Sequence, residues 1–142
     1  MTRFALVVAA SAVLAACSAE SGSDAPAPSE LAGVSFPVAG LTGQVEAGRV
    51  VFARCRSCHA VEPGAKRVGP TLHAVVGRPM GSVEGFRYSG AMQGGGKVWT
   101  EDQLFAFLEA PRQVTPGTTM TFAGIKDPQQ RADVIAYLKT LS

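Results

Sequence analysis

The sequence predicts one small all-α domain, from about Gly43 to Ser142, in which three main helices and long loops surround a flat group. Three stretches carry helical spacing of apolar residues or helix-capping residues, and no good strand pattern accompanies them. More than half of the sixteen glycines lie between the first and second stretches. Such a density of glycine indicates irregular backbone, which suits a chain wrapped around a planar partner.

The first predicted helix runs over about 44–58, and its broad apolar side consists of Val45, Val51, Phe52 and Cys55. The second begins at Thr100, whose hydroxyl can cap the helix while Gln103 reaches back as its capping-box partner. Pro111 ends this helix after a run of apolar residues, which are Leu104, Phe105, Phe107 and Leu108.

The third predicted helix has the clearest start signal. Asp127 is placed to cap it, Pro128 takes the first helical position and Gln130 takes the box position. The apolar residues that follow at helical spacing are Val134, Ile135, Leu138 and Leu141. These positions indicate a helix that packs one face against the rest of the domain.

The run Cys55-Arg56-Ser57-Cys58-His59 carries the chemistry. A C-x-x-C-H sequence is typical of covalent haem c attachment, because two thiols three residues apart lie on one face of a helical turn and can both reach the vinyl groups of one porphyrin. The adjacent imidazole of His59 can then ligate the iron. A thioredoxin-like motif would follow a strand in a βαβ unit, and a structural zinc site would need a second ligand pair. Neither accompanies this run.

The amino-terminal segment predicts export. Arg3 precedes the apolar run 4–16, which is too short to span a bilayer unaided. The sequence 14–17, Leu-Ala-Ala-Cys, resembles the lipobox of bacterial lipoproteins, in which Cys17 is lipidated and becomes the mature amino terminus. Ordinary secretory cleavage and an uncleaved anchor are the alternatives. We therefore expect a signal peptide over 1–16 and a lipid anchor on the periplasmic side of a bacterial membrane, the inner membrane in the first instance.

The segment 17–42 is predicted to be a lipidated flexible tether, because it is rich in Ser, Ala, Gly and Pro and has no sustained periodicity. The domain proper is then 43–142. Three cysteines are accounted for by one lipid site and two thioethers, which leaves none for a disulfide. A covalent haem would then stabilise the small core of an exported protein.

Charge is informative only in a limited way. From residue 43 onward the chain holds 12 basic and 8 acidic residues, a formal charge of +4. Five of the basic residues fall near the predicted haem segments: Arg54, Arg56, Lys66, Arg67 and Arg112. They form either an ordinary solvated face or a weak docking ring for an acidic redox partner. A nucleic-acid partner is not expected, since the excess is slight and no binding motif accompanies it.

The order of motifs after the C-x-x-C-H run is recognisable. It continues with Gly69-Pro-Thr-Leu-His-Ala-Val-Val-Gly-Arg78, Gly85-Phe-Arg-Tyr88, Trp99-Thr-Glu-Asp-Gln-Leu104, Pro116-Gly-Thr-Thr-Met-Thr-Phe-Ala-Gly-Ile125 and Val134-Ile-Ala-Tyr-Leu138. From about 43 to 142, this order resembles a class I cytochrome c of the mitochondrial type. The resemblance implies the small cytochrome c fold, with one covalent haem c.

The sixth iron ligand is expected to be Met120, because methionine is the usual soft partner of histidine in such carriers and the resemblance places it here. The segment before Met120 is rich in turn residues, whereas Met80 and Met92 lie in glycine-bounded loops and match no ligand position. A methionine is more often a core filler, which is the alternative for all three. His73 is read as a structural residue and is the fallback ligand.

The resemblance also implies roles around the haem. Pro70 would accept a hydrogen bond from the second ring nitrogen of His59, and a haem propionate would be bound by Arg78, Tyr88 and Trp99. It places Gly48, Phe52 and Tyr137 where the first and last helices cross.

Two departures from the pattern are visible. Phe107 stands where relatives commonly carry a tyrosine, and Met92 where they commonly carry an asparagine. Together they predict a drier methionine side of the haem. Lysines that flank the ligand loop in many relatives are partly replaced, as Gln113 and Thr119 show.

These expectations converge on a monomeric, membrane-tethered periplasmic electron carrier and not an enzyme. Its partners would be a cytochrome bc1-type complex, a terminal oxidase or a photosynthetic reaction centre. Two alternatives remain open at the level of sequence. One is a haem-based gas sensor or enzyme with a labile sixth ligand, and the other is the electron-entry subunit of a larger oxidoreductase.

Overall fold

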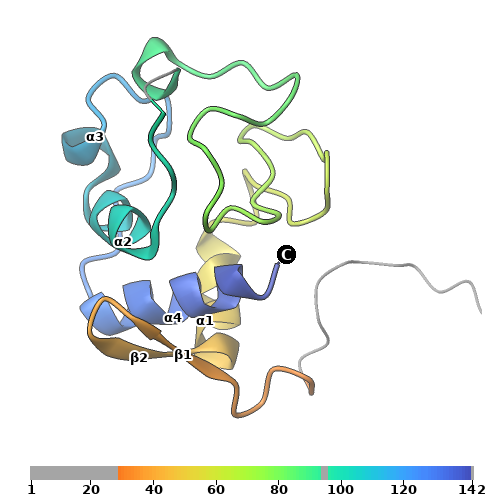
Figure 1. Cartoon of the computed structure of the whole chain (residues 1–142), viewed down its shortest axis with the longest axis vertical. Coiled ribbons are helices and arrows are strands. Elements are labelled where there is room, and N and C mark those ends of the chain that lie inside the picture. The colour runs from red at the N-terminus through yellow and green to blue at the C-terminus, as the bar shows by residue number, and fades with distance from the viewer. Residues whose placement is uncertain (1–28, 94–95, 142) are drawn as a thin grey trace, which may run out of the picture.

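The computed structural model describes residues 29–93 and 96–141. The hairpin β1 (Ser35–Val38) and β2 (Leu41–Gln44) leads into α1 (Val45–Val51), followed by α2 (Glu101–Glu109), α3 (Pro111–Val114) and α4 (Pro128–Lys139). Two short 3₁₀ turns, Phe52–Arg54 and Gly90–Met92, complete the regular structure. Figure 1 shows α4 crossing α1, with the hairpin on one side of α4 and the loops, α2 and α3 on the other.

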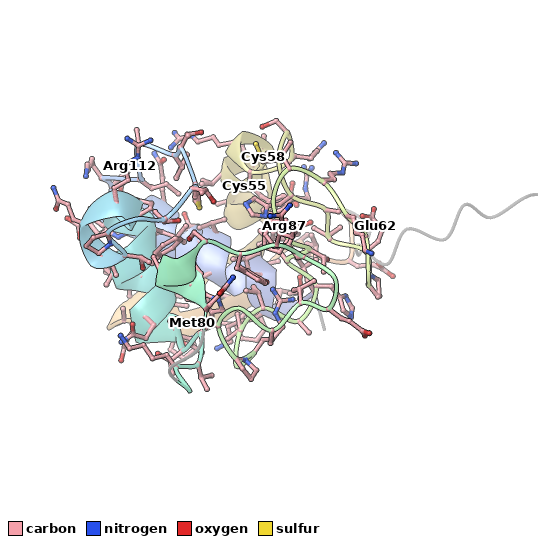
Figure 2. The ribbon with its side chains drawn as sticks, turned by 90° about the horizontal axis from the view of Figure 1, so that it is seen from above. Cys55, Cys58, Glu62, Met80, Arg87 and Arg112 are labelled. Atoms are coloured by element: carbon pink, nitrogen blue, oxygen red, sulfur yellow. The ribbon has the colours of Figure 1, made fainter. Side chains whose placement is uncertain are left out.

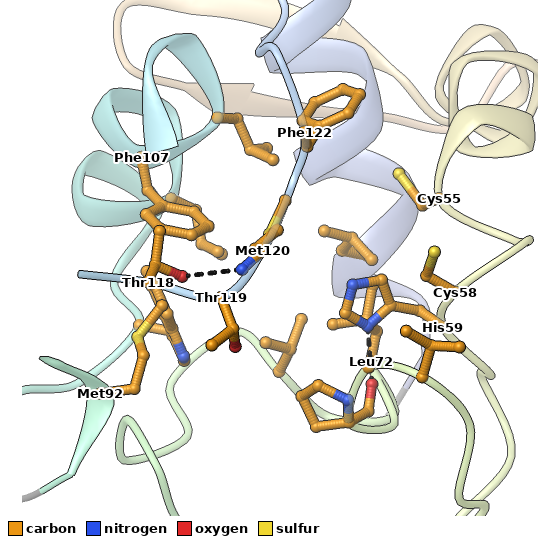
Figure 3. A pocket seen from close by; sticks show the side chains of 18 of the residues that line it. Cys55, Cys58, His59, Leu72, Met92, Phe107, Thr118, Thr119, Met120 and Phe122 are labelled. Carbon is orange, nitrogen blue, oxygen red and sulfur yellow. Dashed lines mark hydrogen bonds between the residues drawn. The ribbon is translucent and has the colours of Figure 1, made fainter. Parts of the chain in front are cut away.

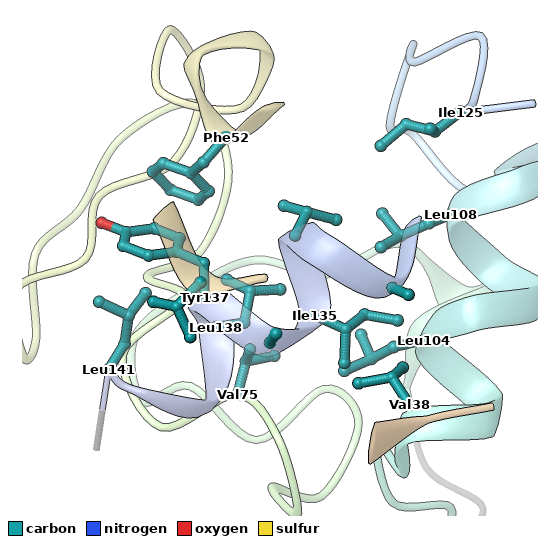
Figure 4. Close-up of a cluster of buried hydrophobic side chains, with 14 of the residues drawn as sticks. Val38, Phe52, Val75, Leu104, Leu108, Ile125, Ile135, Tyr137, Leu138 and Leu141 are labelled. Atoms are coloured by element: carbon teal, nitrogen blue, oxygen red, sulfur yellow. The ribbon is translucent and has the colours of Figure 1, made fainter. Parts of the chain in front are cut away.

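The crossing of α1 and α4 is close because Gly48 has no side chain. A Cβ atom at this position would overlap with the backbone oxygen of Asp133 and with Cβ of Tyr137. One turn further along, the rings of Phe52 and Tyr137 pack with their centroids 5.2 Å apart and their planes inclined at 55°. Figure 4 shows this pair at one end of a continuous apolar core. The contact expected between the first and last helices is present.

Both later helices begin at the predicted caps. Thr100 Oγ1 accepts a hydrogen bond from the backbone N–H of Gln103 at 3.1 Å. Asp127 Oδ1 accepts from the backbone N–H groups of Gln129 and Gln130, at 2.8 and 3.4 Å. Only half of the predicted capping box forms at Thr100, because its own N–H donates to the carbonyl oxygen of Val98.

The first helix is shorter than predicted. It ends at Val51, and the chain tightens into the 3₁₀ turn before the C-x-x-C-H run. Cys55 N–H donates to Phe52 O at 2.8 Å, and His59 N–H then donates to Cys55 O at 2.9 Å. The haem-attachment run is therefore a single separate turn, in which the two thiols and the imidazole still come from one short segment.

The prediction of a flexible tether over 17–42 is wrong for its described part. Leu31 and Val38 are 3% and 1% exposed and belong to the core. The hairpin pairs Ser35 with Gln44 in antiparallel register, and Asp133 Oδ1 accepts a 2.8 Å hydrogen bond from Gln44 N–H. The folded domain thus includes Leu31 and the hairpin and does not begin at residue 43. Four-residue strands were missed because so short an alternation is weak, and Pro37 interrupts it.

The predicted signal peptide over 1–16, Cys17 and the rest of the tether to residue 28 lie outside the described residues. Within 29–93 and 96–141, no helix is both long enough and apolar enough to cross a membrane.

Candidate functional site

A cavity of about 370 Å³ lies in the middle of the domain. Segments far apart in the sequence line it: the 3₁₀ turn Phe52–Arg54 with the C-x-x-C-H turn, the loop after it, the 3₁₀ turn at Gly90–Met92, α2, the loop before α4, and α4 itself. Its walls are mostly apolar. His59 and Met120 face each other across this space, and Cys55 and Cys58 stand at its edge (Figure 3).

His59 is held from behind by the loop that follows it. Its Nδ1 lies 2.7 Å from the carbonyl oxygen of Pro70, so Nδ1 carries the proton and the other nitrogen points into the cavity (Figure 3). Gly69 lies directly against the imidazole, where any Cβ would overlap with the ring. Burial lowers the pKa of His59, the Pro70 carbonyl opposes this shift, and the positive charge of Arg78 adds to it. The neutral ring is the form that binds iron.

Cys55 and Cys58 are free thiols whose sulfur atoms lie on the His59 side of the cavity (Figure 3). Cys55 is half-buried and Cys58 is exposed. Burial raises the pKa of Cys55 to about 11, which keeps this thiol protonated at neutral pH.

Met120 sits on the opposite wall, on the loop between α3 and α4. The loop turns at Gly117, whose φ of +86° is a left-handed conformation that suits glycine. Three residues later, Met120 N–H donates to Thr118 Oγ1 at 3.3 Å. Met80 does not line the cavity, and neither does His73, whose buried Nδ1 has no hydrogen-bond partner within 29–93 and 96–141. Met92 does line it, as its expected place on the methionine side of the haem requires.

One part of the cavity wall is polar. Arg78 donates to the carbonyl oxygens of His73 at 2.6 Å and Thr71 at 2.8 Å, which fixes its guanidinium and leaves further N–H groups unused. The backbone of Trp99 pairs with that of Arg78, and Trp99 and Tyr88 both line the cavity with it. The structure thus brings the three predicted propionate ligands to one cavity.

Ser89 is a residue that the sequence analysis missed. It lines the same cavity, and its hydroxyl is buried without any hydrogen-bond partner in the described structure. A buried hydroxyl without a partner is costly, so it indicates that a polar group of a ligand belongs beside it. Its position directly after Tyr88 was the available signal. A flat apolar group with carboxylates at one edge fits this cavity.

The family model described as cytochrome c matches residues 45–142. The chain belongs to the cytochrome c family. Within it, cytochrome c 2.1 of Caenorhabditis elegans is 46% identical over 101 residues, which are 70% of this chain and 91% of that protein. Cytochrome c2 of Rhodomicrobium vannielii is 52% identical over 94 residues, 66% of this chain and 75% of that protein.

A solved structure agrees with these relatives. Cytochrome cH from Methylobacterium extorquens matches with a TM-score of 0.66 and 42% identity, over 69% of this chain and 99% of that one. The predicted class I family, the small cytochrome c fold and the single covalent haem c are therefore confirmed. This cytochrome c is a monohaem electron carrier.

Proposed function

We propose that Cys55 and Cys58 bind haem c through two thioethers, with His59 and Met120 as the axial ligands of its iron. The observation that carries this proposal is the placement of His59 and Met120 on opposite walls of one cavity, with both thiols at its edge (Figure 3). The haem supplies one-electron chemistry, and the side chains around it set its potential.

The protein residues keep the two axial positions filled. Pro70 fixes the imidazole of His59 from behind, and the turn at Thr118 fixes the backbone of Met120. With both positions taken by side chains, no substrate reaches the iron, and so we propose a carrier and not an enzyme. Arg78, Tyr88, Trp99 and Ser89 would hold the propionates, because each offers a donor to a carboxylate beside the cavity.

Electrons would enter and leave at the edge of the haem near Cys58. Val68 lines the mouth of the cavity and is 82% exposed, which makes it an apolar contact point. Arg54, Arg56 and Arg67 are exposed in the surrounding segments, and Figure 2 shows Arg112 at the same edge of the domain as Cys55 and Cys58. A small apolar patch with arginines around it suits brief docking to an acidic partner surface.

The partners would be respiratory or photosynthetic complexes: a cytochrome bc1-type complex as donor, and a terminal oxidase or a reaction centre as acceptor. We further propose that the protein is a monomer held on the periplasmic side of a bacterial membrane, the inner membrane, by lipid on Cys17. This rests on the lipobox-like sequence 14–17. Fractionation tests it: Cys17→Ala should move the protein from the membrane to the soluble fraction, and unchanged membrane association would reject the lipid anchor.

Carbon monoxide tests the central proposal. We expect the optical spectrum of the reduced protein to be unchanged by the gas, because Met120 keeps the sixth position. A prompt spectral change would show an open position and would favour the gas sensor or enzyme. Purification of the untagged protein in stable complex with one enzyme would favour an electron-entry subunit instead.

A further inference from the structure

A second thioether shares the Met120 side of the cavity. Met92 lines the cavity that Met120 lines, and Figure 3 shows its side chain on the Met120 side, beside Phe107 and Thr118 and across from His59. We propose that Met92 is a reserve sixth ligand, which binds the iron when Met120 is displaced. This inference rests on the proposed function, since it requires a haem iron held by His59.

Hydrogen bonding and close packing hold the backbone of Met92 in place. Met92 N–H donates to Ser89 O at 2.9 Å, closing the 3₁₀ turn Gly90–Met92. Its carbonyl oxygen packs against Gly81 so closely that a Cβ atom there would overlap with it. The turn therefore stays in place, and movement is left to the unbranched side chain with its three rotatable bonds. Such a side chain can swing within the cavity without unfolding the loop.

Chemistry favours Met92 over the other side chains in reach. A thioether is a soft ligand that suits haem iron paired with histidine. No described lysine lines the cavity, and two of them are engaged elsewhere: Lys126 Nζ donates to Glu109 O at 2.7 Å, and Lys139 pairs with Glu101. Within the described residues, His59 is also the only histidine that lines the cavity.

The ligand loop itself offers no replacement. The segment 111–125 contains Arg112 but neither lysine nor histidine, and a guanidinium stays protonated and cannot ligate iron. The neighbours Phe107 and Phe122 offer no ligand atom. Met92 is thus the soft donor left on that side of the cavity once Met120 is gone.

The test removes Met120 and asks which methionine replaces it. In ferric Met120→Ala we expect the thioether-to-iron charge-transfer band to persist, and in the ferrous form slow binding of carbon monoxide. Met120→Ala/Met92→Leu should lose the band and bind the gas promptly. Met120→Ala/Met80→Leu is the matched control and should behave as Met120→Ala, because Met80 lies outside the cavity and away from the two cysteines (Figure 2).

Two results would overturn the inference: loss of the band in Met120→Ala itself, or its persistence when Met92 is also replaced. Met120 belongs to a loop outside the apolar core, so folding should survive its truncation, and Met120→Leu is a second background that keeps side-chain volume. Carbon monoxide binding by the wild-type protein distinguishes failure of the proposed function from failure of the reserve ligand. Prompt carbon monoxide binding by wild type would reject the proposed function, whereas an inert wild type with an open Met120→Ala would reject the reserve ligand alone.

Discussion

The carbonyl oxygen of Pro70 lies 2.7 Å from Nδ1 of His59, and Gly69, the residue before Pro70, lies against the face of the same ring. One dipeptide thus fixes both the tautomer and the orientation of the imidazole. A ligand held this way keeps a strong donor nitrogen directed at the iron in both oxidation states.

Gly69→Ala should disturb this arrangement. The new Cβ would stand about where the ring now is, 2.7 Å from Nδ1, so either the imidazole or the loop must move. We expect a lower yield of the low-spin holoprotein and a shifted reduction potential, measured by optical redox titration. Gly90→Ala is the control, since nothing lies within 4 Å of its Cβ position. Equal behaviour of the two variants would contradict the role of Gly69.

Gly48→Ala should destabilise the domain although alanine is the better helix former. Helix propensity alone would stabilise α1 by about 1 kcal/mol. The added Cβ would overlap with the backbone of Asp133 and with Tyr137, and overpacking of this kind costs about 1–3 kcal/mol or more. Denaturant unfolding should therefore show a net loss. A net gain in the free energy of unfolding would mean that α1 and α4 can separate at little cost.

The sequence was sufficient for the parts of the fold that are set locally. The caps Thr100 and Asp127 work as predicted because their hydrogen bonds are made within four residues of the chain. The haem-attachment turn was equally readable, since Cys55, Cys58 and His59 carry their chemistry in one short run.

Features that depend on distant contacts could not be read. The hairpin is stabilised by α4, through Asp133 and Gln44, which are 89 residues apart in the chain. Ser89 gains its place in the cavity only when the loop folds across it. Residues 29–42 have the composition of a tether. They are buried because they pack against α4, and their own sequence pattern does not predict this burial.

Two alanines in left-handed backbone offer a gain in stability. Ala39 and Ala74 have φ values of +47° and +48°, and a left-handed L-residue costs about 1–2 kcal/mol. Glycine removes this strain, but it also raises the conformational entropy of the unfolded chain, which cancels part of the gain in stability. We expect Ala39→Gly and Ala74→Gly each to raise the free energy of unfolding by about 0.5–1 kcal/mol. Ala47→Gly in α1 is the control and should lower it.

Tyr137 should give the protein an alkaline limit. It is 4% exposed, and burial raises the pKa of its phenol, against the opposing charges of Arg56 and Arg49. The folded state then holds a proton that the unfolded chain releases near pH 10, so this contribution to stability is complete below that pH and is lost as the pH rises through the folded pKa.

Denaturant titration at several pH values checks this expectation against Tyr137→Phe, which has no phenol to ionise. Wild type should lose stability relative to the variant above about pH 10 and not below it. A difference between the two proteins that stays constant from neutral to strongly alkaline pH would show that the phenol does not titrate differently on folding.

Phe107→Tyr should raise the reduction potential. The Phe107 ring is 5% exposed, packs on Trp99 with centroids 4.9 Å apart, and lies beside Met120 and Thr118 (Figure 3). A hydroxyl added there could donate to the sulfur of Met120 and draw electron density from it, which disfavours the ferric iron more than the ferrous. Redox titration measures the shift.

Phe105→Tyr is the matched control. Phe105 lies on the same helix but does not line the cavity, and its ring packs against Arg131, whose guanidinium carbon is 4.3 Å from the ring centroid. An unmoved potential in Phe107→Tyr, or an equal shift in both variants, would show that the dry methionine side does not set the potential.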